Sequence, residues 1–97
     1  MQIRLNSTLR GRVGRRRFEL GLPDGTTVRQ ALDIVAMEAP DLTSIVLDAD
    51  GNLQPNIVIF RNGRNIEFFD GLDTLLQASD TLDIFPKTGA QRAFATS

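Results

Sequence analysis

Apolar and polar residues alternate in two short stretches near the N-terminus, and this pattern predicts two β-strands. The first stretch is "IRLNSTL", residues 3–9, and the second is "FELGL", residues 18–22, in which Phe18, Leu20 and Leu22 share one face. Alternation of this kind places the apolar side chains on one side of a strand. An arginine- and glycine-rich segment lies between the two stretches, so we expect a β-hairpin with a polar loop.

The segment after this hairpin has the apolar spacing of an amphipathic helix. Thr27 is followed three residues later by Gln30. This pair fits a capping box and predicts that the helix starts there. Pro40 marks the far limit of the helix, because the residue before a proline avoids the helical conformation. A further short turn of helix is expected over residues 42–46. The apolar stripe of the main helix consists of Val28, Leu32, Val35 and Ala36.

A second hairpin is predicted in the C-terminal half. In "NIVIFRNGRNIEFF" the pair Asn62-Gly63 is the preferred one for a tight turn between two strands. The next stretch, "DGLDTLLQASD", has no strand alternation and is expected to be a loop with a helical turn. "TLDIF" then ends the fold as a strand, with Leu82 and Ile84 on one face.

These elements occur in the order strand, strand, helix, strand, strand, strand. One mixed sheet of about five strands, with one main helix across one face, satisfies this order in a small α+β domain. The helical crossover between the hairpins places the first and last strands side by side in the middle, which is the ubiquitin-like β-grasp arrangement. We expect residues 1–86 to form this domain and residues 87–97 to form a flexible C-terminal tail.

Strand alternation also predicts an apolar patch on the sheet face away from the helix. If Ile57 and Ile59 face the helix, the residues that alternate with them face outward. Exposed aromatic patches are typical of protein interfaces, although the tail or a second copy of the chain could cover this one instead. The patch is expected to contain Val58, Phe60 and Phe85, and the candidate partner-binding residues also include Pro86 and Lys87.

Charge is distributed unevenly, although the net charge is only −1. Five arginines lie within residues 10–17, whereas acidic residues dominate from Asp41 to Asp83. The arginines could contact phosphate or an acidic partner. We favour a solvated loop, because two glycines and no aromatic residue for base stacking lie within the run. Nucleic acid is therefore not the expected partner. Arg61 and Arg64 flank the tight turn, and both are expected to extend into solvent.

Composition argues against an enzyme that acts alone. The 97 residues contain no Cys and no His, so thiolate chemistry, the commonest general base and the commonest transition-metal ligand are missing. We find no nucleophile–base pair, no metal constellation and no catalytic residue, and we expect no bound cofactor. No apolar run approaches the length of about 20 residues that spans a bilayer, and the N-terminus lacks a signal-peptide core. The sequence therefore predicts a cytoplasmic carrier or binding protein.

Several motifs together resemble one family of small carriers. The relevant stretches are "PDGTTVRQALD", "NGRNIEFFDGLDT" and "DIFP", within a resemblance that covers about residues 2–86. The sequence is similar to the sulfur carriers related to the small subunit of molybdopterin synthase and to the thiamine sulfur carrier, the MoaD/ThiS family. This resemblance implies a β-grasp fold and a role in a molybdopterin- or thiamine-type pathway.

The resemblance also implies a chemistry that uses the chain terminus rather than a side chain. Members of this family end in Gly-Gly. An adenylating enzyme similar to ubiquitin-activating enzymes uses ATP to activate the terminal carboxylate, and sulfur is then installed as a thiocarboxylate. The implied partners are this enzyme and a synthase-type large subunit. Glycine suits such a tail because it has no Cβ and lets the backbone pass a narrow channel.

The tail of this sequence departs from that pattern. The two glycines of the family would fall near Ala90 and Gln91, whereas this tail has a single glycine, Gly89, followed by Ala90. Three interpretations stay open: processing exposes Gly89 or Ala90 as the reactive end, the chain is a non-conjugating interaction module, or the tail itself binds through Phe94. Lys87 is the one lysine in the sequence and lies at the root of the tail. We therefore do not expect polymer chains built through an internal lysine.

Overall fold

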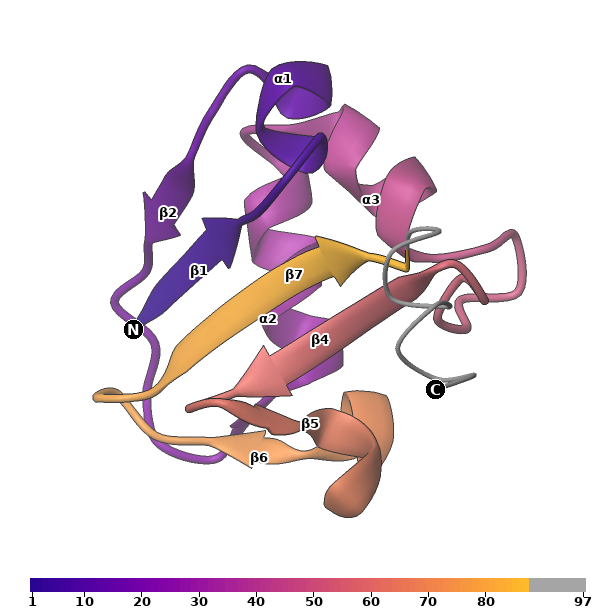
Figure 1. Ribbon diagram of the computed structural model, residues 1–97. Coiled ribbons are helices and arrows are strands. Elements are labelled where there is room, and N and C mark those ends of the chain that lie inside the picture. Colours follow the sequence, from indigo (N-terminus) through magenta and orange to yellow (C-terminus); the bar gives the residue numbers. More distant parts are fainter. Residues whose placement is uncertain (88–97) are drawn as a thin grey trace.

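The computed structural model describes residues 1–87, and their helices and strands follow the predicted order with several additions (Figure 1). The strands are β1 (Gln2–Leu5), β2 (Arg17–Glu19), β3 (Thr26–Thr27), β4 (Ile57–Arg61), β5 (Arg64–Asn65), β6 (Leu75–Leu76) and β7 (Thr81–Pro86). The α-helices are α1 (Leu9–Val13), α2 (Val28–Ala36) and α3 (Pro40–Val46), and two short 3₁₀ helices are η1 (Ile66–Phe68) and η2 (Gly71–Asp73).

Five strands form one mixed sheet in the order β2-β1-β7-β4-β5. β7 lies in the middle, parallel to β1 and antiparallel to β4. The neighbouring pairs β1–β2 and β4–β5 are antiparallel hairpins. The first and last strands are therefore side by side, as predicted, and the fold is the expected α+β, ubiquitin-like β-grasp. Figure 1 shows α2 behind the sheet, crossing under β7 and β4.

The main helix forms as its cap and its apolar stripe predict. The Thr27 side chain accepts a hydrogen bond from the Gln30 backbone N–H, and the Gln30 side chain accepts one from the Thr27 N–H, which completes the capping box. Val28, Leu32 and Val35 are buried in the core. Opposite them, the inward residues of the central strands include Ile3, Leu5, Ile57, Ile59, Leu82 and Ile84, all of which are at most 2% exposed.

The second hairpin also forms around the predicted turn, but its second strand is short. Asn62 and Gly63 have φ values of 51° and 85°, which is the left-handed geometry that Asn-Gly favours in tight hairpins. β5 ends at Asn65 because the Asn65 side chain accepts a hydrogen bond from the Glu67 N–H and starts η1. The expected loop after it contains β6, which pairs with β3 in a small second sheet.

Two expectations for the N-terminal segment are wrong. The first strand ends at Leu5 rather than continuing to residue 9, and Ser7 has a positive φ of 58°. The arginine-rich segment contains a short helix, α1, rather than only a loop. Leu9 is buried in the core and anchors this helix, which ends at Gly14 with a left-handed φ of 84°. Burial of the Leu9 side chain thus stabilises a short helix within the otherwise polar segment between β1 and β2.

The proposed tail boundary lies at the limit of the described structure. β7 ends at Pro86, and the backbone N–H of Lys87 donates a hydrogen bond to the Asn56 carbonyl at 2.6 Å. Residues 88–97 lie outside the described residues, and with them Gly89, Ala90 and Phe94. The expected division into a domain of residues 1–86 and a tail of residues 87–97 stays a prediction.

Candidate functional site: the open face of the sheet

The sheet face opposite α2 carries the two aromatic residues that strand alternation predicts there. In the observed register Phe60 lies across from Asp83, and Phe85 lies across from Val58. The rings of Phe60 and Phe85 meet edge to face, with 5.5 Å between centroids and an interplanar angle of 84°. Such a pair is worth about 0.5–1.5 kcal/mol beyond the area that it buries. The predicted closeness of the two strands and of these two rings is confirmed.

The predicted exposure of Val58 is wrong. Val58 does not belong to the core cluster on the α2 side, yet it is only 4% exposed. Its short side chain lies directly across from Phe85 and two positions from Phe60 on the same strand face. The larger rings next to it leave little of its surface accessible. The exposed part of the patch therefore comes from the two half-buried phenylalanines, and Lys87 is exposed beside them.

An ion pair lies next to the aromatic rings on the same face. The Arg4 guanidinium donates to both carboxylate oxygens of Asp83, at 2.7 Å from Nε and 2.8 Å from Nη2. This hydrogen bond, followed by the charge of Asp83, raises the pKa of Arg4. Asn6 also donates to the Ile84 carbonyl at 3.3 Å. The Arg4–Asp83 pair is not among the residues predicted from the sequence. The predicted pairing of the first strand with the last could have indicated it, because that pairing places Arg4 next to Asp83.

A second charged cluster lies at the opposite end of β7. Asp80 accepts hydrogen bonds from Arg61 Nε at 2.8 Å, from Asn62 Nδ2 at 2.9 Å and from the Gln77 N–H at 2.8 Å. Burial raises the pKa of Asp80, but these hydrogen bonds and the charge of Arg61 outweigh burial and hold the pKa below its usual value. This cluster joins the hairpin turn to β7 and is a structural feature rather than an open site.

The expectation that both turn arginines extend into solvent is wrong for one of them. Arg61 and Arg64 are cross-strand partners. Arg61, however, binds Asp80, and its guanidinium lies 5.1 Å from the centre of the Phe69 ring. Arg64 is exposed. The two like charges are thereby held apart, because the acidic partner of Arg61 draws it toward β7.

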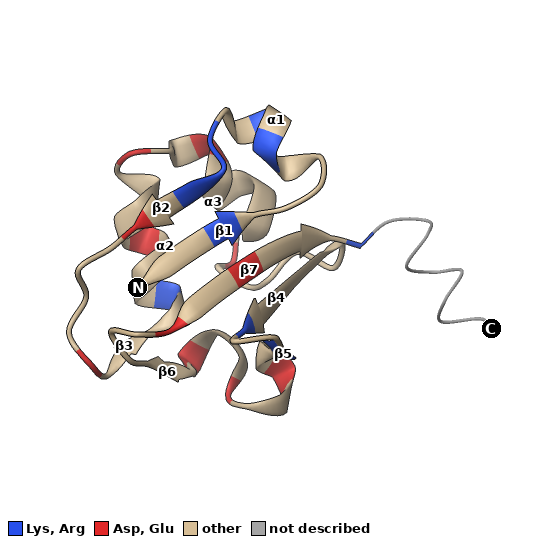
Figure 2. Cartoon of the chain, turned by 60° about the vertical axis from the view of Figure 1, so that its left-hand side comes forward, with Lys and Arg blue, Asp and Glu red and all other residues tan. Residues whose placement is uncertain are grey.

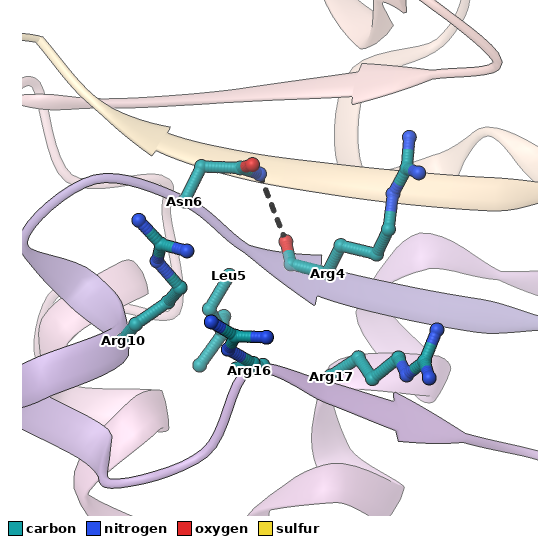
Figure 3. A pocket seen from close by; sticks show the side chains of 6 residues that line it. All are labelled: Arg4, Leu5, Asn6, Arg10, Arg16 and Arg17. Atoms are coloured by element: carbon teal, nitrogen blue, oxygen red, sulfur yellow. Dashed lines mark hydrogen bonds between the residues drawn. The ribbon is translucent and has the colours of Figure 1, made fainter.

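Arginine side chains gather at the sheet end where β1 and β7 both stop. Figure 2 shows several basic residues on α1, β1 and the start of β2, whereas the segments around β5 and β6 carry both acidic and basic residues. A hollow of about 290 Å³ lies at the basic end. Its lining consists of Arg4, Leu5, Asn6, Arg10, Arg16 and Arg17 (Figure 3). The sequence shows the run of arginines but not that α1 brings some of them to one hollow.

Within residues 1–87 no group of three or more His, Cys, Asp or Glu side chains is placed to hold a metal ion. None of the helices over the same residues is long and apolar enough to cross a membrane. What the open face offers is an aromatic pair, an ion pair and a basic hollow. These features make the open face the candidate binding surface.

Comparisons with known proteins agree with this fold. The sequence matches the ThiS family over residues 3–89. It is 28% identical over 86 residues to small archaeal modifier protein 3 of Haloferax volcanii, a match that covers 89% of this chain and 92% of that protein. The structure is similar to the crystal structure of small archaeal modifier protein 1 from Haloferax volcanii, with a TM-score of 0.79 and 30% identity, covering 92% of this chain and 96% of that one.

A solution structure of small archaeal modifier protein 1 from Methanosarcina acetivorans is also similar, with a TM-score of 0.75 and 26% identity over 91% of this chain and 92% of that one. Carriers of the ThiS family are not catalysts themselves. Adenylating enzymes similar to ubiquitin-activating enzymes activate them with ATP, and biosynthetic enzymes are their further partners. The match over most of the chain and the β-grasp sheet together show that this protein belongs to the ThiS family of ubiquitin-like modifiers and sulfur carriers.

Proposed function

We propose that this protein is a carrier whose C-terminal carboxyl group, after processing near Gly89, is activated by an adenylating enzyme that uses ATP. The single observation that supports this most is the family match, which extends through β7 and ends at residue 89. β7 leads directly from the middle of the sheet toward that residue. The reactive carboxyl group would belong to Gly89 or Ala90.

The proposed chemistry requires only a carboxylate from this chain. A carboxylate oxygen attacks the α-phosphorus of ATP, pyrophosphate leaves, and an acyl adenylate forms. Hydrosulfide from a sulfur donor then attacks the acyl carbon of the adenylate, AMP leaves, and a thiocarboxylate for a molybdopterin- or thiamine-type pathway forms. The folded domain holds the chain against the partner while this happens. Binding energy from a docking face thus positions a terminus that has no catalytic side chain of its own.

The proposed docking face is the aromatic pair and the strand end beside it. Phe60 and Phe85 combine apolar area with fixed geometry, since each packs against the other. Pro86 and Lys87 continue the same strand toward the C-terminus. Residues that dominate interfaces are often aromatic and cluster near the centre. The adenylating enzyme and a synthase-type large subunit would use this face in turn.

Intact mass of the protein from its own cells tests the processing step. A species ending at Gly89 or Ala90 is expected, together with a form in which one carboxyl oxygen is replaced by sulfur. A single species ending at Ser97 would contradict the proposal. It would leave the alternative of a non-conjugating interaction module, which the lack of a Gly-Gly pair after β7 in the sequence favours.

Matched phenylalanine variants test the docking face. With the adenylating enzyme of the same cells, Phe60→Ala is expected to raise the KM for this protein in an ATP–pyrophosphate exchange assay by about tenfold or more. Phe68→Ala is the control, because Phe68 is 78% exposed on η1 and lies outside the aromatic pair. Equal KM values for the two variants would show that the partner docks elsewhere. Circular dichroism of both variants checks that the fold is kept.

A further inference from the structure

Two arginine side chains converge on the hollow at the basic end of the sheet. Figure 3 shows the side chain of Arg16, from the loop before β2, over Leu5, and that of Arg10, from α1, on the same side of the hollow. Arg17 points along β2, and Arg4 extends across β7. Arg10 and Arg16 also line a neighbouring hollow of about 410 Å³. Two positive charges that line the same hollow repel each other, and an anion bound in that hollow reduces the repulsion.

The positive charge of this pair is not compensated within residues 1–87. Arg4 binds Asp83, and Arg15 lies 3.7 Å from a carboxylate oxygen of Glu38. In the same part of the chain no salt bridge and no side-chain hydrogen bond involves Arg10 or Arg16. Their ten guanidinium N–H donors therefore face solvent and can receive carboxylates, which match the planar arginine fork.

An acidic protein segment fits this hollow better than a nucleic acid does. Binding of single-stranded RNA draws on aromatic side chains that stack on bases, and none lines either hollow. The one aromatic residue of the neighbouring strand, Phe18, is fully buried, and the Arg15 guanidinium covers its ring at 4.2 Å. Carboxylates need no stacking platform, and two adjacent forks can hold two of them.

The hollow is also close to the aromatic docking face. Asn6 lines the hollow, and its backbone N–H donates to the carbonyl of Ile84 on β7 at 3.1 Å. Arg4 and Asp83 lie in the same cross-strand row as Phe60. A protein that covers Phe60 and Phe85 would therefore reach the hollow across a single intervening strand.

We propose that the hollow formed by Arg10 and Arg16 binds an acidic segment of a protein partner, through aspartate or glutamate side chains. This proposal does not depend on the activation chemistry, because the hollow and its charge exist whether or not the terminus is processed. Under this proposal the arginine-rich segment binds a partner, whereas a solvated loop would have no binding role.

Two double variants with the same net charge test the proposal. Binding of a fluorescein-labelled peptide of glutamate and glycine is followed by fluorescence anisotropy at low and at near-physiological salt. Arg10→Gln/Arg16→Gln is expected to weaken peptide binding by about fivefold to tenfold. Arg12→Gln/Arg64→Gln removes the same charge from exposed positions that line neither hollow and is expected to change binding by less than about twofold. Equal weakening by both variants would overturn the proposal, and so would absence of peptide binding at low salt.

A charge swap and an RNA probe complete the experiment. Arg10→Glu/Arg16→Glu is expected to lose the glutamate peptide and to gain binding of a lysine–glycine peptide, a gain that a folding defect cannot produce. A labelled single-stranded RNA of the same formal charge as the glutamate peptide is measured in parallel. RNA binding that is tighter than peptide binding and is lost in Arg10→Gln/Arg16→Gln would overturn the proposal in favour of a nucleic-acid surface.

Discussion

Asp80 illustrates what a single side chain contributes to this protein. Its carboxylate is 5% exposed and receives hydrogen bonds from the hairpin turn, from β4 and from the turn before β7. Because it is buried, its charge is stable only while these donors stay in place. Asn62, which is part of the tight turn, also accepts a hydrogen bond from the Thr81 N–H. One acidic residue thus connects the edge hairpin to the central strand.

The lowered pKa of Asp80 predicts a loss of stability in acid. A carboxyl group whose pKa is lower in the folded state than in the unfolded state contributes stability above the unfolded pKa, about 3.9. That contribution disappears as the pH falls below about 4 toward the folded-state pKa. Asp80→Asn removes this contribution, and the free energy of unfolding is expected to drop by about 1–3 kcal/mol at neutral pH. Urea denaturation at several pH values measures both effects.

Asp33→Asn is the matched control for this change, because Asp33 is exposed on α2 and makes no ion pair within residues 1–87. Its unfolding free energy is expected to stay within about 0.5 kcal/mol of the original. If Asp80→Asn and Asp33→Asn had the same stability at neutral pH, the proposed role of the Asp80 hydrogen bonds would be wrong.

At the scale of elements, helix caps and turns decide where segments begin and end. α2 has a complete capping box, whereas the N-cap residue of α1, Thr8, makes no side-chain hydrogen bond to its helix. The capped helix α2 has nine residues, whereas α1, without a side-chain cap, has five. The difference in capping also explains why α2 was predicted from its sequence and α1 was not, since α1 depends on the burial of Leu9.

The two threonine caps provide a matched pair of variants. Thr27→Ala is expected to lower the free energy of unfolding by about 1 kcal/mol, because the Gln30 N–H loses its acceptor at the start of α2. Thr8→Ala removes no such bond and is expected to have little effect. Thermal or urea denaturation of both proteins measures the difference. A cost for Thr8→Ala as large as that for Thr27→Ala would contradict this account.

Glycine variants test the hairpin turn in the same way. A Cβ at Gly63 would meet no atom within 4 Å, but the φ of 85° is unfavourable for any L-residue with a side chain. Gly63→Ala is therefore expected to cost about 1–2 kcal/mol of unfolding free energy. Gly11→Ala, within α1, is expected to be neutral or to add up to about 1 kcal/mol, because alanine favours helix. Loss of stability in Gly11→Ala alone would show that the backbone argument fails.

At the scale of the whole molecule, stability is concentrated in the middle of the large sheet. β7 is paired on both sides, and its inward residues Leu82 and Ile84 are fully buried. β3 and β6 have two residues each and pair only with each other. Segments with many buried contacts open with higher free energies than short peripheral ones. The proposed docking face thus lies on the part of the fold that we expect to open last.

Hydrogen exchange measures this distribution directly. The slowest-exchanging amides are expected in β1, β4 and β7, with protection near the global free energy of unfolding. Amides of α1 and of the β3–β6 pair are expected to exchange faster through local opening. NMR-detected exchange in the native state resolves the individual amides. Equal protection of β6 and β7 would show that the small sheet unfolds only together with the large one.

The sequence by itself determined the order of the main elements, the faces of the central strands and the family. Its signals are local: the capping box at Thr27, the Asn62-Gly63 turn, and the alternation around Leu82 and Ile84. Each of these signals depends on interactions between residues that are close along the chain, so the sequence alone is enough to predict the local structure. The inward faces were predicted well because burial of alternating apolar residues follows from strand geometry.

Only the tertiary structure decided how the outward side chains meet. Arg4 and Asp83 are 79 positions apart in the chain, and the burial of Val58 depends on rings from two different strands. The convergence of Arg10 and Arg16 depends on α1, which forms because Leu9 finds a place in the core. Such contacts arise from long-range packing that no neighbouring residue encodes, which is why the ion pair beside the aromatic rings, the burial of Val58 and the basic hollow became visible only in the folded molecule.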